Sequence, residues 1–332
     1  MNFSVAFSGD FSVVKEAWPI AGEGFVISRE TKKDALVVTV SLTRGGRTGQ
    51  GEGAPLRRYH HTQNSVAAEI DAWLQGGYPW TRDTLLETMK AGPARFALDT
   101  ALWMLEAAER HQSFAEYAGI TAREWPTAFT ISGGAPDTMA DAALAHQKFC
   151  WLKIKLMGDG LDAERLYAIH SQVSEKELIV DANEALTPED LTDLLPVFEF
   201  CNVVLVEQPL PAGKDEALRG FKSPIPFAAD ESCHTIDDLE GLVGKYQVVN
   251  LKLDKTGGLT HALQMKKRAR ELGFDVMLGC MASTGLSLLP ACAAAEGCTY
   301  LDLDGALLLV KDRPDSKISY RDGKVCLLDS EE

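Results

Sequence analysis

Four polar residues each follow a short apolar stretch in the second half of the chain. Asp181 ends LIVD, Glu207 ends VLVE, Asp230 ends FAAD and Lys252 ends VVNLK, at intervals of 26, 23 and 22 residues. Taken singly, such an acid is equally well explained as a turn former or a loop residue, because Asp is common where strands end. The regular spacing instead predicts that all four side chains gather at one end of a parallel sheet.

Three carboxylates gathered in one place repel one another unless a cation lies between them. Oxygen ligands of this kind suit a hard divalent ion such as Mg²⁺ or Mn²⁺. Asp181, Glu207 and Asp230 are therefore candidate metal ligands.

Two lysines interrupt the apolar run WLKIKL, residues 151–156. Lys153 and Lys155 share one face of a strand, a pattern that a half-solvated strand also produces. A strand of a barrel is covered on both faces, however, so here the lysines would point into the barrel. Burial and neighbouring cations can lower a lysine's pKa towards neutrality, which makes Lys155 and Lys252 candidate bases and Lys153 the neighbouring cation.

The elements that would position these residues alternate regularly over residues 119–310. The β-rich runs are TAFTI, CWLKIKL, ELIVDA, NVVLVEQP, PIPFAADE, QVVNLKL, DVMLGCM and TYLDLD, separated mostly by amphipathic segments. Strand, helix and strand at this interval predict parallel strands joined by crossover helices. Eight strands in succession predict an α/β fold, a modified TIM barrel of (β/α)7β type, with its active site at the C-terminal ends of the strands.

The first third of the chain has a different pattern. Residues 34–53 predict a hairpin that turns at Gly45 and Gly46, and three amphipathic helices follow, the first opened by Ser65. This is an α+β module of ordinary domain size.

The tail contains a second hairpin, with Asp322 and Gly323 between two alternating stretches. We expect it to return to the N-terminal module. The predicted domains are therefore an α+β capping domain of residues 1–118 plus 311–332 and a barrel domain of residues 119–310.

Bulk properties limit the possible partners. The chain has 332 residues and a formal net charge of -15, which argues against a nucleic acid or an anionic membrane and leaves a small ligand open. Seven cysteines without C-x-x-C spacing are expected to be buried thiols in a reducing cytoplasm. The first residues have no pattern of a signal peptide and no window reaches transmembrane length, so we expect a soluble, cytoplasmic protein, and a homo-oligomer.

The order of the lysines and acids resembles that of the enolase superfamily, muconate-lactonizing subgroup. The resemblance extends over essentially the whole chain and rests on the capping module followed by Lys153, Lys155, Asp181, Glu207, Asp230 and Lys252. Members of this superfamily remove a proton alpha to a carboxylate and stabilise the resulting anion with Mg²⁺.

The resemblance implies a role for each of these residues. The three acids would be metal ligands, Lys155 and Lys252 would be acid/base catalysts on opposite faces of the alpha carbon, and Lys153 would polarise the substrate carboxylate. Two lysines fit racemisation or epimerisation, although members that catalyse cycloisomerisation or dehydration have the same lysines.

Asp302 and Asp304, in the run TYLDLDG, help to distinguish between these reactions. A lone D-x-D is more often a strand edge or a loop. Within the superfamily it resembles the motif of dipeptide epimerases, whose aspartates bind the alpha-ammonium group of the substrate, and carboxylates are suited to a cationic amine. Thr130, at the end of the first predicted barrel strand, would add a hydroxyl group.

Basic residues of the N-terminal module are candidates for the other end of the substrate. Arg29 follows AGEGFVIS, which resembles the superfamily's specificity loop, and Arg57 and Arg58 occur in PLRRYHHT. A basic loop is usually simply solvated. Arg29 or Arg58 could instead bind a side-chain carboxylate with two hydrogen bonds, which favours an acidic second residue.

The sequence therefore predicts a Mg²⁺-dependent dipeptide epimerase that inverts the alpha carbon of the C-terminal residue, with L-Ala-D/L-Glu from bacterial wall peptide as leading substrate. The alternatives are an N-acylamino acid racemase, an o-succinylbenzoate synthase or a muconate cycloisomerase, whose substrates have no free alpha-ammonium group for Asp302 and Asp304. A non-catalytic binding protein is a further alternative, although a buried cluster of charges without a use is costly.

Overall fold

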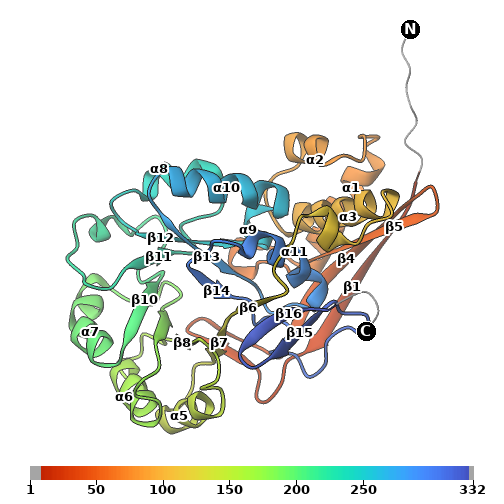
Figure 1. Ribbon diagram of the computed structural model, residues 1–332. Coiled ribbons are helices and arrows are strands. Elements are labelled where there is room, and N and C mark those ends of the chain that lie inside the picture. The colour runs from red at the N-terminus through yellow and green to blue at the C-terminus, as the bar shows by residue number, and fades with distance from the viewer. Residues whose placement is uncertain (1–8, 329–332) are drawn as a thin grey trace.

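Eight parallel strands form the central sheet, and each is hydrogen-bonded to its neighbours in chain order. The computed structural model describes residues 9–328, so residues 1–8 and 329–332 of the predicted capping domain lie outside it. The order confirms the predicted α/β barrel (Figure 1). The strands are β7 (Ala128–Ile131), β8 (Trp151–Lys155), β9 (Leu178–Asp181), β10 (Val203–Glu207), β11 (Phe227–Ala229), β12 (Val248–Lys252), β13 (Asp275–Gly279) and β14 (Tyr300–Asp302).

Side chains connect the first and last strands where the sheet closes. The Thr127 hydroxyl accepts a hydrogen bond from Leu303 N at 2.8 Å, and Thr130 N donates to Asp304 Oδ2 at 2.6 Å. These contacts bring the residues after β14 beside β7, so the D-x-D motif faces the same interior as the lysines.

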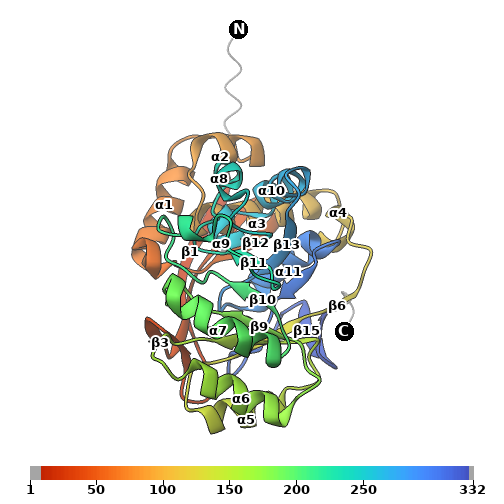
Figure 2. The same cartoon turned by 90° about the vertical axis from the view of Figure 1, so that its left-hand side faces the viewer.

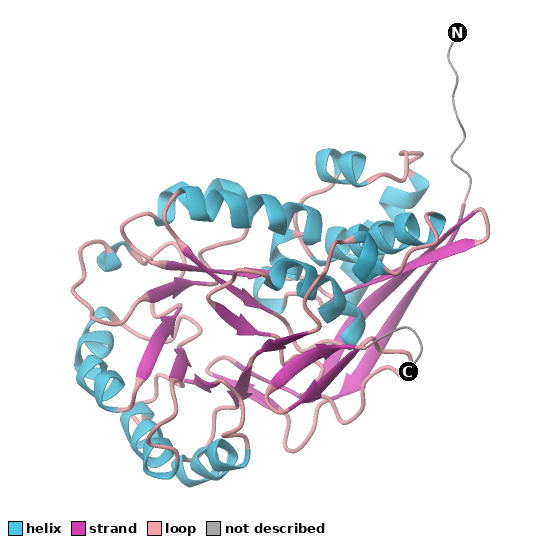
Figure 3. Cartoon of the chain, viewed as in Figure 1, coloured by secondary structure: helices cyan, strands magenta, loops and turns pink. Residues whose placement is uncertain are grey.

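Helices cover the outside of the barrel (Figures 2 and 3). The connection between β10 and β11 contains only a short 3-10 turn, Glu216–Leu218, where the (β/α)7β pattern has an α-helix. Two prolines, Pro209 and Pro211, and Gly213 interrupt this segment, and all three disfavour a helix interior. The helices of the barrel are α5 (Pro136–Ala145), α6 (Asp162–Gln172), α7 (Pro188–Phe200), α8 (Leu239–Leu242), α9 (Leu253–Thr256), α10 (Leu259–Glu271) and α11 (Gly285–Ala295).

The capping module is built on a three-stranded antiparallel sheet. Strands β4 (Asp34–Arg44) and β5 (Arg47–Gly53) form the predicted hairpin, and Gly45 and Gly46 have the positive φ angles, 57° and 73°, that its turn needs. Strand β1 (Asp10–Pro19) pairs with β4 and was not predicted.

Four helices follow this sheet. They are α1 (Gln63–Gln75), α2 (Arg82–Thr88), α3 (Pro93–Glu109) and α4 (Phe114–Tyr117). The first begins two residues earlier than predicted, because Thr62 is its N-cap and Ser65 completes the capping box from the third helical position. Helix α3 packs directly on β5, since a side chain at Gly51 would lie 2.0 Å from Ala97 O.

Two small sheets complete the chain. Strands β2 (Phe25–Ile27) and β3 (Glu30–Lys32) form a hairpin with Arg29 in its turn. The tail hairpin, β15 (Ile318–Arg321) and β16 (Lys324–Leu327), pairs through β16 with β6 (Glu124–Pro126).

Buried polar contacts join the capping module to the barrel. On one side, Asp99 of α3 accepts hydrogen bonds from the hydroxyl group and backbone N of Thr260 in α10, at 2.6 and 3.1 Å. On another, Glu52 of β5 accepts from Thr284, the N-cap of α11, and from Arg313. Arg313 precedes the tail hairpin, so this residue links the tail to the capping sheet.

The cysteines are all free thiols, but not all are buried. Cys150 is exposed and Cys280 and Cys298 are partly exposed, so the expectation of uniformly buried thiols is wrong for these three. Between residues 9 and 328, the helices are all too short or too polar to cross a membrane.

Candidate active site

Three neighbouring barrel strands present polar side chains at one level because the strands pair in register. Lys155 of β8 pairs with Asp181 of β9, and Asp181 pairs with Glu207 of β10. Residues in register on parallel strands point to the same face of the sheet. All three side chains therefore enter the barrel together.

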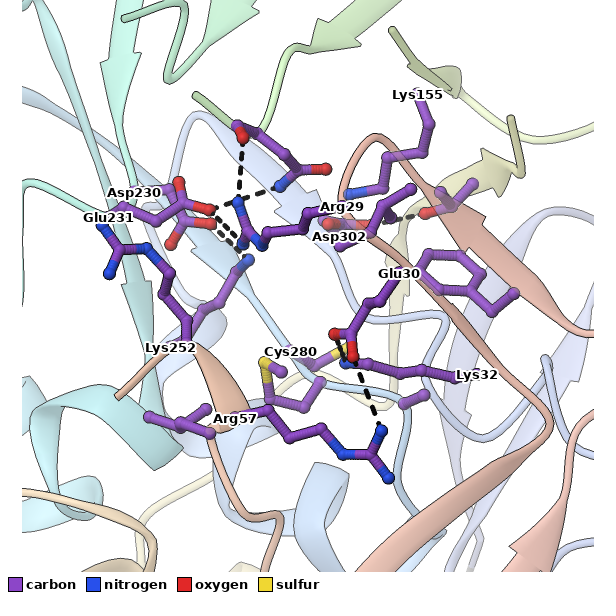
Figure 4. Close-up of a pocket in the computed structure, with 18 of the residues that line it drawn as sticks. Arg29, Glu30, Lys32, Arg57, Lys155, Asp230, Glu231, Lys252, Cys280 and Asp302 are labelled. Carbon is purple, nitrogen blue, oxygen red and sulfur yellow. Dashed lines mark hydrogen bonds and ion pairs between the residues drawn. The ribbon is translucent and has the colours of Figure 1, made fainter. Parts of the chain in front are cut away.

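The opposite wall carries Lys252 and Asp302 in the same way. Lys252 of β12 is in register with Gly279, which is in register with Asp302 of β14. A side chain on Gly279 would lie 2.7 Å from Asn250 Oδ1 and 3.0 Å from Lys252 Cε. The glycine therefore leaves room for the lysine, and Lys155 and Lys252 face each other across the cavity (Figure 4).

Lys153 is the buried centre of the acidic cluster. Its Nζ lies 2.7 Å from Glu207 Oε2, 2.7 Å from Asp302 Oδ2 and 3.2 Å from Asp181 Oδ2. Burial opposes a charge here, but the three carboxylates outweigh it and raise the pKa of Lys153 well above its ordinary value. Lys153 is thus a fixed ammonium group that links acids from both walls.

Lys155 and Lys252 each bind a different acid. Lys155 Nζ donates to Asp181 Oδ2 and Lys252 Nζ donates to Asp230 Oδ2, both at 2.6 Å. Burial favours a lower pKa for Lys252, but Asp230, Glu207 and Asp181 raise it above the ordinary value. The three carboxylates therefore favour the ammonium form of Lys252, whereas burial alone would favour the neutral amine.

The three acids differ in their electrostatic surroundings. Burial acts to raise the pKa of Asp181 and of Asp230, but the adjacent lysines hold both pKa values below the ordinary range. Glu207 is different, because burial and the charge of Asp181 raise its pKa to about 7. Its Oε1 accepts a hydrogen bond from Asn250 Nδ2 at 2.7 Å.

The donor set suits a hard divalent cation, since it consists of three buried carboxylates from adjacent strands. Within residues 9–328, no three His, Cys, Asp or Glu side chains are arranged as a ready-made metal site. Instead, the acids form ion pairs with lysines. Lys153 pairs with Asp181 and Glu207, and Lys252 pairs with Asp230. Positive charge is thus stabilised where these acids gather, and the residues present fit a cation there.

The D-x-D motif lies in the same cavity. Asp302 binds Lys153 and lies 3.5 Å from the Thr130 hydroxyl group, whereas Asp304 accepts a hydrogen bond from Thr130 N. Burial and the charge of Asp302 raise the pKa of Asp304 to about 7. The structure therefore brings Asp302, Asp304 and Thr130 together, as expected.

The two predicted substrate-binding arginines are bound by protein carboxylates. Arg29 Nη2 donates to Glu231 Oε1 at 2.7 Å and its Nη1 donates to Asn183 O at 2.8 Å. Arg58 donates to both oxygens of Glu184, at 2.8 and 3.2 Å. These arginines hold the capping loops against the barrel rim in this structure.

Two other basic residues face the cavity and share a single acid. Glu30 lies 3.2 Å from Lys32 Nζ and 3.7 Å from Arg57 Nη1 (Figure 4). Burial lowers the pKa of Lys32. One carboxylate facing two cations leaves an excess of positive charge on this side, which suits an acidic ligand group.

Sequence reasoning did not single out Asn250, Lys255 or Lys32. Asn250 precedes Lys252 by two residues, so strand periodicity could have identified it. Lys255, which donates to Asp230 O and Asn250 O at 2.5 and 3.2 Å, lies in the turn of α9, where no periodic signal exists. Lys32 lies in a three-residue strand with ordinary loop composition.

All of these groups surround one cavity beneath the capping loops. The empty space in and in front of it is about 810 Å³, open solvent included, and its polar lining comes from both modules. The cavity therefore combines acids, amines on opposite walls and a basic side under the cap.

Comparison with known proteins identifies the family. The family described as "Enolase C-terminal domain-like" matches residues 137–330. The chain therefore belongs to the enolase superfamily, as the order of its lysines and acids predicts.

The particular relatives are epimerases and racemases. An L-Ala-D/L-Glu epimerase of Escherichia coli (strain K12) is 43% identical over 90% of this chain and 94% of the relative. An N-acetyl-D-glutamate racemase of Pseudoalteromonas sp. is 43% identical over 85% of this chain and 90% of the relative. These relatives confirm the expectation of an isomerase that acts on amino acid derivatives.

Solved structures share the fold over nearly the whole chain. An enolase family member from Agrobacterium tumefaciens with homology to dipeptide epimerases, with bound sodium and L-Ala-L-Glu, has a TM-score of 0.92 and 40% identity and covers 97% of this chain and 98% of its own. A dipeptide epimerase from Methylococcus capsulatus, complexed with Mg and L-Arg-D-Lys, has a TM-score of 0.87 and 29% identity, with 96% and 97% of the two chains covered.

Proposed function

We propose that this chain is a Mg²⁺-dependent dipeptide epimerase that inverts the alpha carbon of the C-terminal residue, with L-Ala-D/L-Glu as leading substrate. The observation that carries the proposal is the placement of Lys155 and Lys252 on opposite walls of a cavity that also contains Asp302 and Asp304. An amine on each side of a carbon suits inversion, because one can remove a proton while the other returns one to the opposite face.

The proton balance involves only the two lysines and the substrate. One lysine, as the neutral amine, takes the alpha proton and becomes an ammonium group. The opposite lysine, as the ammonium group, then gives its proton to the other face of the carbon and becomes neutral. One C–H bond breaks and one forms, and the two lysines exchange their charge states.

The three acids would hold the metal. Mg²⁺ bound by Asp181, Glu207 and Asp230, or Mn²⁺ in its place, would supply positive charge that stabilises the negative charge developing on the substrate carboxylate. Neutralising these acids would also lower the pKa of Lys252, because their charges are what raise it. Magnesium in the related Methylococcus capsulatus dipeptide epimerase supports this assignment.

The two ends of the cavity suit the two ends of an acidic dipeptide. The carboxylates of Asp302 and Asp304 favour the alpha-ammonium group of the first residue. On the capping side, Lys32 and Arg57 favour a side-chain carboxylate on the second residue, in the role that we expected of Arg29 or Arg58. The names of the Escherichia coli relative and of the Agrobacterium tumefaciens complex support Ala and Glu.

An N-acylamino acid racemase is the second candidate. The Pseudoalteromonas relative is a racemase of N-acetylglutamate, which has no alpha-ammonium group. Lys153 already binds the Asp302 carboxylate. Asp302 therefore keeps a positively charged partner even when the substrate has no ammonium group. Both candidates share the proton transfer and differ in what the D-x-D motif recognises.

One experiment tests the proposal and separates the two candidates. The protein is incubated in D₂O with Mg²⁺ and either L-Ala-L-Glu or N-acetyl-L-glutamate, and the alpha protons are followed by NMR. We expect loss of the Glu alpha signal of the dipeptide, retention of the Ala alpha signal, and slower exchange of N-acetylglutamate. Faster exchange of N-acetylglutamate would support the racemase, and no exchange with a panel of dipeptides would support a non-catalytic binding protein.

The biological setting follows from the proposed substrate. A dipeptide of Ala and Glu is a fragment of bacterial wall peptide, which places the reaction in wall peptide metabolism. A cytoplasmic location and a homo-oligomeric state stay predictions, as does the division into residues 1–118 plus 311–332 and residues 119–310.

A further inference from the structure

Glu184, at the rim of the barrel, accepts four hydrogen bonds but has no role in the site described above. Glu184 Oε2 accepts from Arg58 Nε at 2.8 Å and from Arg29 Nη1 at 3.3 Å. Glu184 Oε1 accepts from Arg58 Nη2 at 3.2 Å and from Ala212 N at 2.9 Å. Both oxygens are thus fully engaged, and the side chain of Glu184 is only 9% exposed.

The donors come from three segments that are distant in the sequence. Arg29 lies in the turn between β2 and β3, and Arg58 lies in the 3-10 turn Arg57–Tyr59 that follows β5. Ala212 lies in the connection between β10 and β11. A single acid of the barrel therefore ties both capping loops to the rim beside the cavity.

The backbone at this acid is held in an unusual conformation. Asn183 and Glu184 have φ angles of 45° and 72°, in the left-handed region that residues other than glycine rarely adopt. Glu184 N donates to Gln208 O at 3.0 Å, and Arg29 donates to Asn183 O. Such a conformation persists where surrounding contacts determine it, and here it directs the carboxylate to the two arginines.

The two loops also carry the basic residues that face the cavity. Lys32 follows Arg29 by three residues, and Arg57 is next to Arg58. The position of Lys32 and Arg57 over the cavity therefore depends on where Arg29 and Arg58 are held. Loss of the Glu184 contacts would release Arg58 and weaken the attachment of Arg29, which would keep its hydrogen bonds to Glu231 Oε1 and Asn183 O.

We propose that Glu184 is a positioning residue that holds the two capping loops closed over the barrel mouth, so that it governs substrate affinity while leaving the proton transfer itself to other groups. The consequence for affinity rests on the proposed function, whereas the consequence for the loops does not. Two readouts separate these parts.

The first readout is limited digestion with trypsin, for which the loops contain built-in cleavage sites after Arg29, Lys32, Lys33, Arg57 and Arg58. In Glu184→Gln we expect cleavage after Arg57 and Arg58 to accelerate about tenfold, because the charge-assisted hydrogen bonds of Arg58 are lost. Cleavage after Arg29, Lys32 and Lys33 should accelerate less, because Arg29 keeps its contacts with Glu231 and Asn183. The matched control is Glu189→Gln, which removes the same charge from an exposed residue nearby. Equal cleavage rates in Glu184→Gln, Glu189→Gln and the unaltered protein would overturn the proposal.

A second variant covers the case in which Glu184→Gln does not fold. Arg58→Lys keeps the tryptic site and a positive charge but loses the two-pronged contact with Glu184. We expect it to accelerate cleavage after Arg29 and Lys32, in the β2–β3 hairpin, about threefold, because that hairpin shares the same carboxylate. No change in the hairpin would contradict the coupling of the two loops.

The second readout is the split between KM and kcat for the dipeptide. In Glu184→Gln we expect KM to rise about tenfold and kcat to change less than about twofold, since the lysines and acids inside the barrel are untouched. A fall in kcat at constant KM would overturn the positioning role. If the unaltered protein exchanges no alpha proton, the proposed function fails, and the digestion alone decides the role of Glu184.

Discussion

The barrel mouth and the capping loops hold charges in two different ways. In the mouth, lysines and acids come from regular strands, and Lys153, Asp181 and Glu207 are each at most 1% exposed. In the capping loops, Arg29 and Arg58 have side chains that are 33% and 44% exposed and come from irregular segments. The charges of the mouth are thus fixed by regular, buried strands, whereas those of the capping loops lie on irregular and partly exposed segments.

This difference has an energetic side. Breaking a buried ion pair leaves a charge without compensation and costs several kcal/mol, whereas an exposed ion pair contributes little. The mouth should therefore tolerate few substitutions without loss of activity. The loops should tolerate more, with effects that concern which substrate is bound.

Removal of the divalent cation should have the largest effect, because it acts on the barrel mouth and leaves the capping loops unchanged. We expect exhaustive treatment with a chelator to reduce exchange of the Glu alpha proton at least about 10³-fold, since the charge that stabilises the anion is lost. Adding back Mg²⁺ or Mn²⁺ should restore the rate, as measured by NMR in D₂O. Undiminished turnover by protein that contains no metal by elemental analysis would refute the assignment of the three acids.

Substitution of Asp302 tests the recognition end of the mouth. Asp302→Asn should lower kcat/KM for L-Ala-L-Glu about 100-fold, because a charge-assisted contact with the ammonium group is lost. The control is the same dipeptide with an acetylated N-terminus. The ratio of the two rates should fall towards one in the variant, and an unchanged ratio would remove the ammonium group from the role of Asp302.

Substitution of Lys32 tests the loops. Lys32→Met should lower kcat/KM for L-Ala-L-Glu about tenfold and that for L-Ala-L-Ala less than about twofold, because only the first has a second carboxylate to bind. The neighbouring exposed Lys33 gives the matched control, Lys33→Met. Equal losses on both substrates would mean that Lys32 supports the fold of the loop and does not select the acidic residue.

The joint between the two modules should affect stability and leave catalysis nearly unchanged. Burial raises the pKa of Asp99 to about 6 from an ordinary 3.8, so between these values the folded protein binds the proton that the unfolded chain releases. The contribution of Asp99 to the free energy of unfolding therefore falls as pH rises from about 4 to about 6, by up to ~3 kcal/mol. In Asp99→Asn this pH dependence should disappear.

The measurement is the difference in denaturant-induced unfolding between the unaltered protein and Asp99→Asn at several pH values. Asparagine can accept the hydrogen bond of Thr260 N through its Oδ1 and can donate from its Nδ2 to the hydroxyl oxygen of Thr260, so the variant should fold. A difference that does not vary with pH would show that Asp99 is not the titrating group.

The sequence was sufficient to predict the barrel and the residues that its strands carry. Strand periodicity places Lys153 and Lys155 on one face, and the regular intervals place Asp181, Glu207 and Lys252 at one end of the sheet. The structure confirms that these side chains converge. They were predictable because side chains of a strand alternate between only two faces.

Contacts between distant segments could not be predicted in this way. Nothing in the sequence near Arg29 and Arg58 shows that Glu184 would bind both. The tail hairpin illustrates the same limit, since its turn at Asp322 and Gly323 was predicted but its pairing with β6 was not. Local patterns determine turns and faces, whereas partners depend on how separate elements meet.

The placement of one amine on each side of the reacting carbon is tested most directly by the stereochemistry of single-lysine variants. Lys155→Ala and Lys252→Ala are each incubated in D₂O with Mg²⁺ and with L-Ala-L-Glu or L-Ala-D-Glu, and exchange at the Glu alpha carbon is followed by NMR. We expect neither variant to epimerise and each to exchange the alpha proton of a different isomer. Exchange of the same isomer by both variants would contradict an arrangement of the two lysines on opposite faces.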